Sequence, residues 1–107
     1  MGRIVLAGAA PLARDAVFVV NVPRQRSGLA ERLGCARFAD GCVEVDEFAR
    51  TSVPGVYAAG DMARRATVPM PVAAVVGAAA AGTIAAAAID QDLLSADFGL
   101  PAPFAKG

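Results

Sequence analysis

The stretch "TSVPGVYAAGD", residues 51–61, decides how this chain is expected to fold. Its proline–glycine pair at 54–55 has type II turn chemistry, because proline presets one central φ and glycine supplies the positive φ at the next position. Residues 56–58 are β-prone and predict a short strand after this turn. Gly60 and Asp61 would then form the tip at the carboxyl end of that strand.

A tip of this kind is suited to holding a ligand. Ligands of open α/β sheets bind outside the carboxyl ends of strands, and Gly60 lacks a Cβ, so that a ligand can approach the backbone closely. Asp61 offers an acceptor to a ligand hydroxyl, as the ribose-binding acid does in dinucleotide sites. The alternative is a plain Gly-Asp turn with a solvated carboxylate.

An alanine-rich helix is predicted over about residues 71–90, after a loop. Its N–H groups and the positive end of its dipole would face the tip and favour an anionic or electron-rich ligand. Residues 72–89 are 18 uncharged residues, which approaches the length of a membrane span. Ten of them are alanine, which adds little transfer energy, so we expect a helix buried against a sheet or ligand rather than in a membrane.

The N-terminal half predicts two strands and a short helix. Residues 3–7 and 16–20 read as strands, and the β-branched and aromatic run at 17–20 suggests burial on both faces. Ser27 is expected to cap a helix that runs through Leu33, with Gly34 as its C′ residue.

A further strand is predicted after a turn at residues 40–41. Its alternating pattern places Val43 and Val45 inward, and Glu44 and Asp46 outward.

Composition excludes several classes of function. The 107 residues allow one domain. Ten basic and ten acidic residues cancel, which argues against binding nucleic acid or an anionic membrane. The chain has no histidine, so Ser-His and Cys-His nucleophile pairs and histidine-ligated zinc are excluded. We predict no catalytic residue and no metal site.

The cysteines and arginines are each open to two interpretations. Cys35 and Cys42 form neither a CxxC pair nor half of a zinc site, so we expect two unpaired thiols in a reducing cytoplasm, with a redox pair as the alternative. Four loop arginines could neutralise a phosphate or be plain solvated charges: Arg24, Arg26, Arg64 and Arg65.

The whole pattern resembles a known family. "RTSVPGVYAAGD", followed after a loop by an alanine–glycine helix, resembles the second flavin-binding motif of FAD-dependent pyridine nucleotide–disulfide oxidoreductases, and most closely the thioredoxin reductase-like branch. "RDAVFVV", "SGLAERLGC" and "DGCVEVDEF" stand in the order of that family's C-terminal region, so the resemblance covers about residues 3–95. It implies an α/β fold, a partial FAD/NAD(P)-binding Rossmann-like domain.

The resemblance also implies roles for five residues. Asp61 would accept a hydrogen bond from a ribityl hydroxyl of FAD, and Gly60 would lie against the cofactor. Backbone N–H groups at Ala73, Ala74 and Val75 would face the pyrimidine end of the isoalloxazine. Many relatives carry a glutamine, often preceded by arginine, near the two alanines. Here the flavin contacts from these side chains are expected to be missing.

The sequence lacks other parts that such an enzyme uses: a GxGxxG motif for the pyrophosphate, an NADPH domain and a CxxC pair. We therefore expect residues 1–107 to be a single partial FAD-binding domain. Residues 1–20 would be a strand pair at the exit from the missing NAD(P) domain, and residues 96–107 an irregular tail. NADPH would belong only to the parent family.

Three functional interpretations remain open. The chain could be the C-terminal FAD-binding segment of a thioredoxin reductase-like enzyme, incomplete and inactive alone. It could instead be a split subunit that a separate GxGxxG-bearing chain completes. It could also be a non-enzymatic dimeric interaction module. Its unpaired strand edges and apolar helix predict a homo- or hetero-oligomer in each case.

Overall fold

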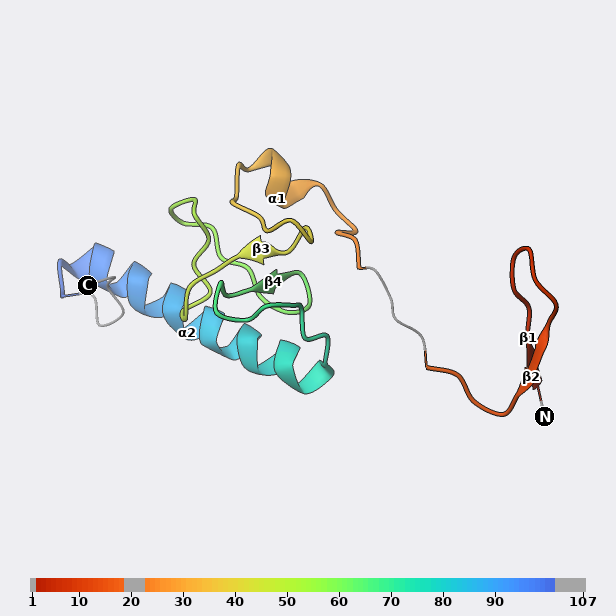
Figure 1. Ribbon diagram of the computed structural model, residues 1–107. Coiled ribbons are helices and arrows are strands. Elements are labelled where there is room, and N and C mark those ends of the chain that lie inside the picture. The colour runs from red at the N-terminus through yellow and green to blue at the C-terminus, as the bar shows by residue number, and fades with distance from the viewer. Residues whose placement is uncertain (1, 19–22, 102–107) are drawn as a thin grey trace.

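The computed structural model describes residues 2–18 and 23–101. Within them the chain forms two helices and two small sheets (Figure 1). The element order is β1 (Gly2–Ile4), β2 (Leu12–Arg14), α1 (Leu29–Arg32), β3 (Val43–Glu44), β4 (Ala63–Arg64) and α2 (Val75–Phe98). The helices and the parallel pair of strands fit the expected α/β class, although the described residues form no extended sheet.

β1 and β2 form an antiparallel hairpin, in which Arg3 pairs with Ala13. The predicted strand at 3–7 therefore begins earlier and is shorter. The prediction of a strand at 16–20 is wrong for residues 16–18, and residues 19–20 lie outside the described part. Val17 and Phe18 are exposed rather than buried, because no strand among the described residues covers them.

The core lies around β3, which pairs in parallel with β4. Val43 is fully buried and packs with Ala30, Cys35 and Ala58. The sequence prediction of an inward Val43 is thus confirmed, whereas the outward Asp46 is wrong. The Asp46 side chain is only 10% exposed, because its Oδ1 accepts hydrogen bonds from the backbone N–H groups of Phe48 and Arg50 at 2.8 and 3.1 Å.

Local turn chemistry agrees with the sequence. Gly55 has φ of 82° and the N–H of Val56 donates to the carbonyl of Val53 at 3.1 Å, which confirms the turn at 54–55. Gly34, with φ of 83°, follows α1 as its C′ residue. The predicted N-cap is displaced by one residue: Gly28 is the N-cap, and Ser27 Oγ accepts from the N–H of Leu29 at 3.1 Å.

α2 is longer and starts later than predicted. It begins at Val75, after an extended Ala74, and it ends at Phe98 with Gly99 in the left-handed conformation. Residues 96–98 of the predicted irregular tail are therefore helical, and residues 102–107 lie outside the described part. In residues 2–18 and 23–101, no helix combines the length and apolarity that crossing a membrane requires.

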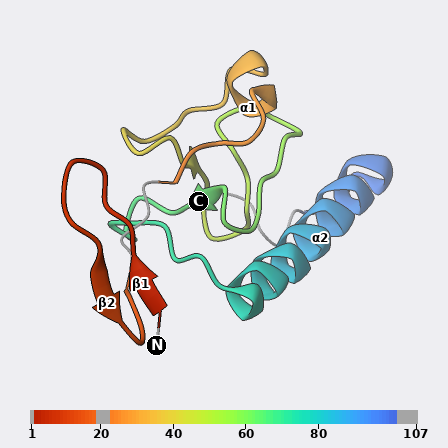
Figure 2. The ribbon, with the colours of Figure 1, turned by 90° about the vertical axis from the view of Figure 1, so that its right-hand side faces the viewer.

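One face of α2 lies against the segment between β3 and β4, to which Tyr57 and Gly60 belong, while the other faces solvent (Figure 2). The packed positions recur at helical spacing and are buried or half-buried: Ala78, Ala81, Ala85, Ala88, Asp92 and Ser95. The opposite face includes Val76 and Leu93, both more than half exposed. This chain therefore covers one face of α2, and burial of the other face stays a prediction.

Candidate functional site

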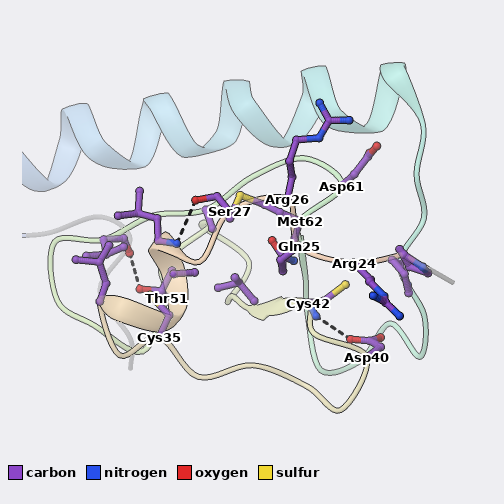
Figure 3. Close-up of a pocket in the computed structure, with 18 of the residues that line it drawn as sticks. Arg24, Gln25, Arg26, Ser27, Cys35, Asp40, Cys42, Thr51, Asp61 and Met62 are labelled. Atoms are coloured by element: carbon purple, nitrogen blue, oxygen red, sulfur yellow. Dashed lines mark hydrogen bonds between the residues drawn. The ribbon is translucent and has the colours of Figure 1, made fainter.

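A cavity of about 820 Å³ opens between the loop at 23–27, α1, β3 and the segment leading into α2 (Figure 3). This volume lies within the range of small-molecule sites. Its floor is apolar and includes Ala30, Val43 and Val56. The polar groups of its wall come from the loop at 23–27, from Asp40 and Thr51, and from residues around the Gly-Asp tip. The cavity thus combines an apolar floor with a small number of polar groups.

Two of the five predicted site residues line this cavity. Asp61 and Ala73 are both on its wall, although twelve residues separate them in the sequence. Figure 3 shows the Asp61 side chain extending toward the side on which α2 passes. Gly60 has φ of 86°, and a Cβ there would lie 3.8 Å from the Cβ of Ala78. The Gly-Asp tip is therefore packed against the first turn of α2.

The remaining two predicted site residues, Ala74 and Val75, lie at the start of α2, which begins later than predicted. Ala74 is the N-cap of α2 and Val75 is its first helical residue, 87% exposed. The N–H of Ala78 already donates to the carbonyl of Ala74 at 2.8 Å. The helix donors at this end are consequently the N–H groups of residues 75–77, and Ala73 precedes the helix.

The loop at 23–27 is held by Gln25. Its Nε2 donates to the carbonyls of Gly41 and Met62 at 3.1 and 3.0 Å, and these residues belong to two separate segments. This places Arg24 and Arg26 on the cavity wall. Sequence reasoning identified both arginines as phosphate candidates, but it gave no signal for the contacts of the Gln25 amide.

The Arg64 guanidinium is already hydrogen-bonded to other residues of the chain. Its Nε donates to Asp40 at 2.9 Å and its guanidinium lies 3.7 Å from the centre of the Phe38 ring. The backbone N–H of Cys42, followed by Arg64, holds the pKa of Asp40 below its usual value. Arg64 is therefore not a phosphate-binding candidate, and Arg65 does not line the cavity.

Both cysteines are buried free thiols in the cavity wall. Burial, followed by the nearby Asp40 carboxylate, raises the pKa of the Cys42 thiol. A raised pKa keeps this sulfur protonated at neutral pH and lowers its nucleophilicity. The expectation of two unpaired thiols is confirmed.

A polar cluster ties α2 to the rest of the fold. Asp92 accepts hydrogen bonds from Arg50 Nε and Nη2 at 3.1 and 2.9 Å, and also from the Tyr57 hydroxyl. Arg50 and then Tyr57 lower the pKa of Asp92, whereas the Asp92 carboxylate raises the pKa of Tyr57. Sequence reasoning did not find this cluster, because 42 residues separate Arg50 from Asp92.

The comparison with protein families covers this same region. Residues 8–74, which include the Gly-Asp tip, the cavity floor and Ala73, match the model of the pyridine nucleotide-disulphide oxidoreductase family. The chain belongs to this family. Members of the pyridine nucleotide-disulphide oxidoreductase family are flavin-dependent and use Rossmann-like FAD/NAD-binding domains. No curated protein matches the chain at a significant level.

The residues present fit part of a flavin. Asp61 supplies an exposed carboxylate acceptor on the cavity wall, and α2 begins two residues after Ala73. A glycine-rich phosphate cradle is absent from the sequence.

Proposed function

We propose that this chain is the C-terminal FAD-binding segment of a thioredoxin reductase-like flavin-dependent NAD(P)H oxidoreductase, incomplete and inactive on its own. The observation that carries the proposal is the convergence of Asp61 and Ala73 on one cavity, with Gly60 packed against the start of α2. Residues 1–107 would form the partial FAD-binding domain. Residues 1–20 would correspond to the exit from the NAD(P) domain, and residues 96–107 to the tail.

In this proposal the chain's own groups hold one end of the cofactor. The Asp61 carboxylate would accept a hydrogen bond from a ribityl hydroxyl, and the N–H groups at the start of α2 would face the electron-rich pyrimidine edge. The bound flavin would supply the electron-transfer chemistry. We propose no NADPH site in this chain. We also propose that the protein is located in the cytoplasm.

A visible absorption spectrum after addition of FAD and passage over a sizing column tests the incompleteness. We expect the flavin band to separate from the protein, because the pyrophosphate and adenosine would remain solvated and ligand sites usually bury most of the ligand. Coelution of flavin and protein would contradict the proposed incompleteness, and reduction by NADPH would then be assayed.

A titration of FAD fluorescence at high chain concentration tests the proposed partial flavin site, which consists of Asp61 and the start of α2. We expect weak saturable binding that falls by about tenfold in Asp61→Ala, since a hydrogen bond to a charged group contributes roughly 1.5–3 kcal/mol. Asp97→Ala, an exposed carboxylate at the far end of α2, is the matched control and should leave the affinity unchanged. Equal affinities for wild type and Asp61→Ala would remove Asp61 from the site.

The open cavity favours a second candidate, a split subunit that a GxGxxG-bearing chain completes. Its apolar floor is only partly covered by this chain, and such a partner would both fill it and bind the pyrophosphate. Retention of FAD on the sizing column only after the separate Rossmann half is added would favour this candidate over an inactive segment.

A further inference from the structure

Two arginines of the cavity wall lack a partner of opposite charge. Arg24 and Arg26 both line the cavity of about 820 Å³, and both residues are exposed. Neither forms an ion pair with another residue of the described ranges, 2–18 and 23–101. Their positive charges are therefore available to a ligand in the cavity.

The acidic residues of the same wall do not cancel these two charges. Asp40 already forms an ion pair, because its Oδ2 accepts from Arg64 Nε at 2.9 Å, and its Oδ1 accepts from the N–H of Cys42 at 2.9 Å. Asp61 is the other acidic residue that lines the cavity. Two guanidinium groups thus stand against one carboxylate, so the cavity favours a ligand that carries an anionic group.

The loop that carries the arginines is tied to the Gly-Asp tip. Gln25 donates through Nε2 to the carbonyl of Met62 at 3.0 Å, and Met62 directly follows Asp61. The same amide donates to the carbonyl of Gly41 at 3.1 Å. Figure 3 shows the side chains of Arg26 and Asp61 extending toward the side on which α2 passes. The backbone of the loop is thus held beside the tip before a ligand binds, which reduces the cost of ordering it.

A flavin that ends in a single phosphate matches this arrangement. Its ribityl chain carries the hydroxyls and ends in the phosphate, so both kinds of group lie on one short chain. When a ribityl hydroxyl donates to Asp61, the phosphate follows along the wall that carries the arginines. The sequence has no glycine-rich backbone cradle for a phosphate. Guanidinium groups can take its place, because they bind phosphate oxygens through charged hydrogen bonds.

We propose that Arg24 and Arg26 form a phosphate site for a mononucleotide flavin, next to the contact at Asp61. The inference rests on the proposed function, since the flavin is taken to meet Asp61, and it adds the form of flavin that the chain prefers. The terminal phosphate of flavin mononucleotide (FMN) is close to doubly charged at neutral pH. The corresponding phosphate of FAD carries one charge and the adenosine half. The chain should therefore bind FMN at least as tightly as FAD.

The test is a set of fluorescence titrations of the full chain with FMN, riboflavin and FAD, at low and at high salt. Riboflavin lacks the phosphate, so the ratio of its dissociation constant to that of FMN measures the phosphate contact. We expect a ratio of about ten at low salt and of less than about three at high salt, because salt screens exposed charges. Riboflavin binding should not depend on salt. Inorganic phosphate should compete with FMN and leave riboflavin binding unchanged.

Charge-removing variants assign the contact to the loop. Arg24→Gln and Arg26→Gln each remove one charge from an exposed residue, so the fold should be unaffected. Each should lower the ratio by about threefold, and the double variant should bring it close to one. Arg32→Gln is the matched control, since Arg32 is an exposed arginine of α1 that does not line the cavity. It makes the same change in net charge and should keep the ratio.

Riboflavin separates this inference from the proposed function. Asp61→Ala should weaken riboflavin by about tenfold, whereas the two arginine variants should leave riboflavin unchanged. Equal affinities for FMN and riboflavin, or tighter binding of FAD than of FMN, would overturn the phosphate site and leave the contact at Asp61 standing. A ratio that Arg32→Gln lowers as much as Arg26→Gln would do the same. Failure of all three flavins to bind would overturn the phosphate site together with the proposed function.

Discussion

The two halves of α2 are attached to the fold in different ways. The C-terminal half is tied by Asp92 to Arg50 and Tyr57 through charged hydrogen bonds. The N-terminal half has only small side chains on its packed face, and it approaches the tip at Gly60 through Ala78. The charged hydrogen bonds of Asp92 thus lie far from the end of α2 that we propose to face the flavin. At that end, α2 is held instead by the close approach of Ala78 to Gly60.

Removing Asp92 should lower the free energy of unfolding more than any other change considered for α2. Asp92→Ala removes the carboxylate that accepts from the half-buried Arg50 guanidinium and from the Tyr57 hydroxyl, while Arg50 keeps its ion pair with Asp46 at 3.8 Å. We expect a loss of about 2–3 kcal/mol in the free energy of unfolding. Denaturant unfolding followed by circular dichroism measures it. Asp90→Ala, an exposed carboxylate two residues away, should cost less than about 0.5 kcal/mol. Equal losses in the two variants would show that the cluster does not anchor α2.

A pair of glycine substitutions sharpens the comparison at the other end of α2. Gly60→Ala should lower the free energy of unfolding by about 1 kcal/mol, because Gly60 has φ of 86° although space for a Cβ exists. Gly77→Ala, inside the first turn of α2, should raise it by up to about 1 kcal/mol. Thermal unfolding of both variants gives the signs. A Gly60→Ala variant that is more stable than wild type would contradict the argument that the positive φ at residue 60 requires glycine.

The pH dependence of stability should show the smallest effect. The pKa of Asp92 is lowered in the fold by Arg50 and then Tyr57 from an ordinary value of 3.8. Its stabilisation is therefore complete above that ordinary value and is lost as pH falls through the lower folded pKa. Unfolding curves between neutral and acidic pH should show this loss in wild type. Asp92→Asn should be less stable at neutral pH and show less of the decline. If the stability of wild type and of Asp92→Asn fell in parallel with pH, the decline would come from other carboxylates.

Sequence reasoning succeeded where the determinants are local. The turn at 54–55, the C′ glycine at 34 and the inward Val43 each depend on a few neighbouring residues, and all three are found. The family was also accessible from residues 51–61 together with the segments before them. Asp61 and Ala73 line one cavity, and their contacts with a flavin stay a prediction.

The remaining features depend on contacts between distant segments. A strand at 16–18 needs a partner backbone, which the described residues do not supply. The inward Asp46 is fixed by hydrogen bonds from Phe48 and Arg50 that alternation cannot show. α2 passes residue 90 because Asp92 and Ser95 continue its packed face, a position that depends on the fold around Tyr57.

The outward face of α2 has a consequence for handling the protein. Val76, Leu93 and Phe98 are exposed on a helix whose charged side chains are three aspartates. With a pI of about 6.1, the chain has little charge repulsion near neutral pH. Its colloidal stability should therefore improve in mildly alkaline buffer, where the acquired negative charge adds to that of the helix.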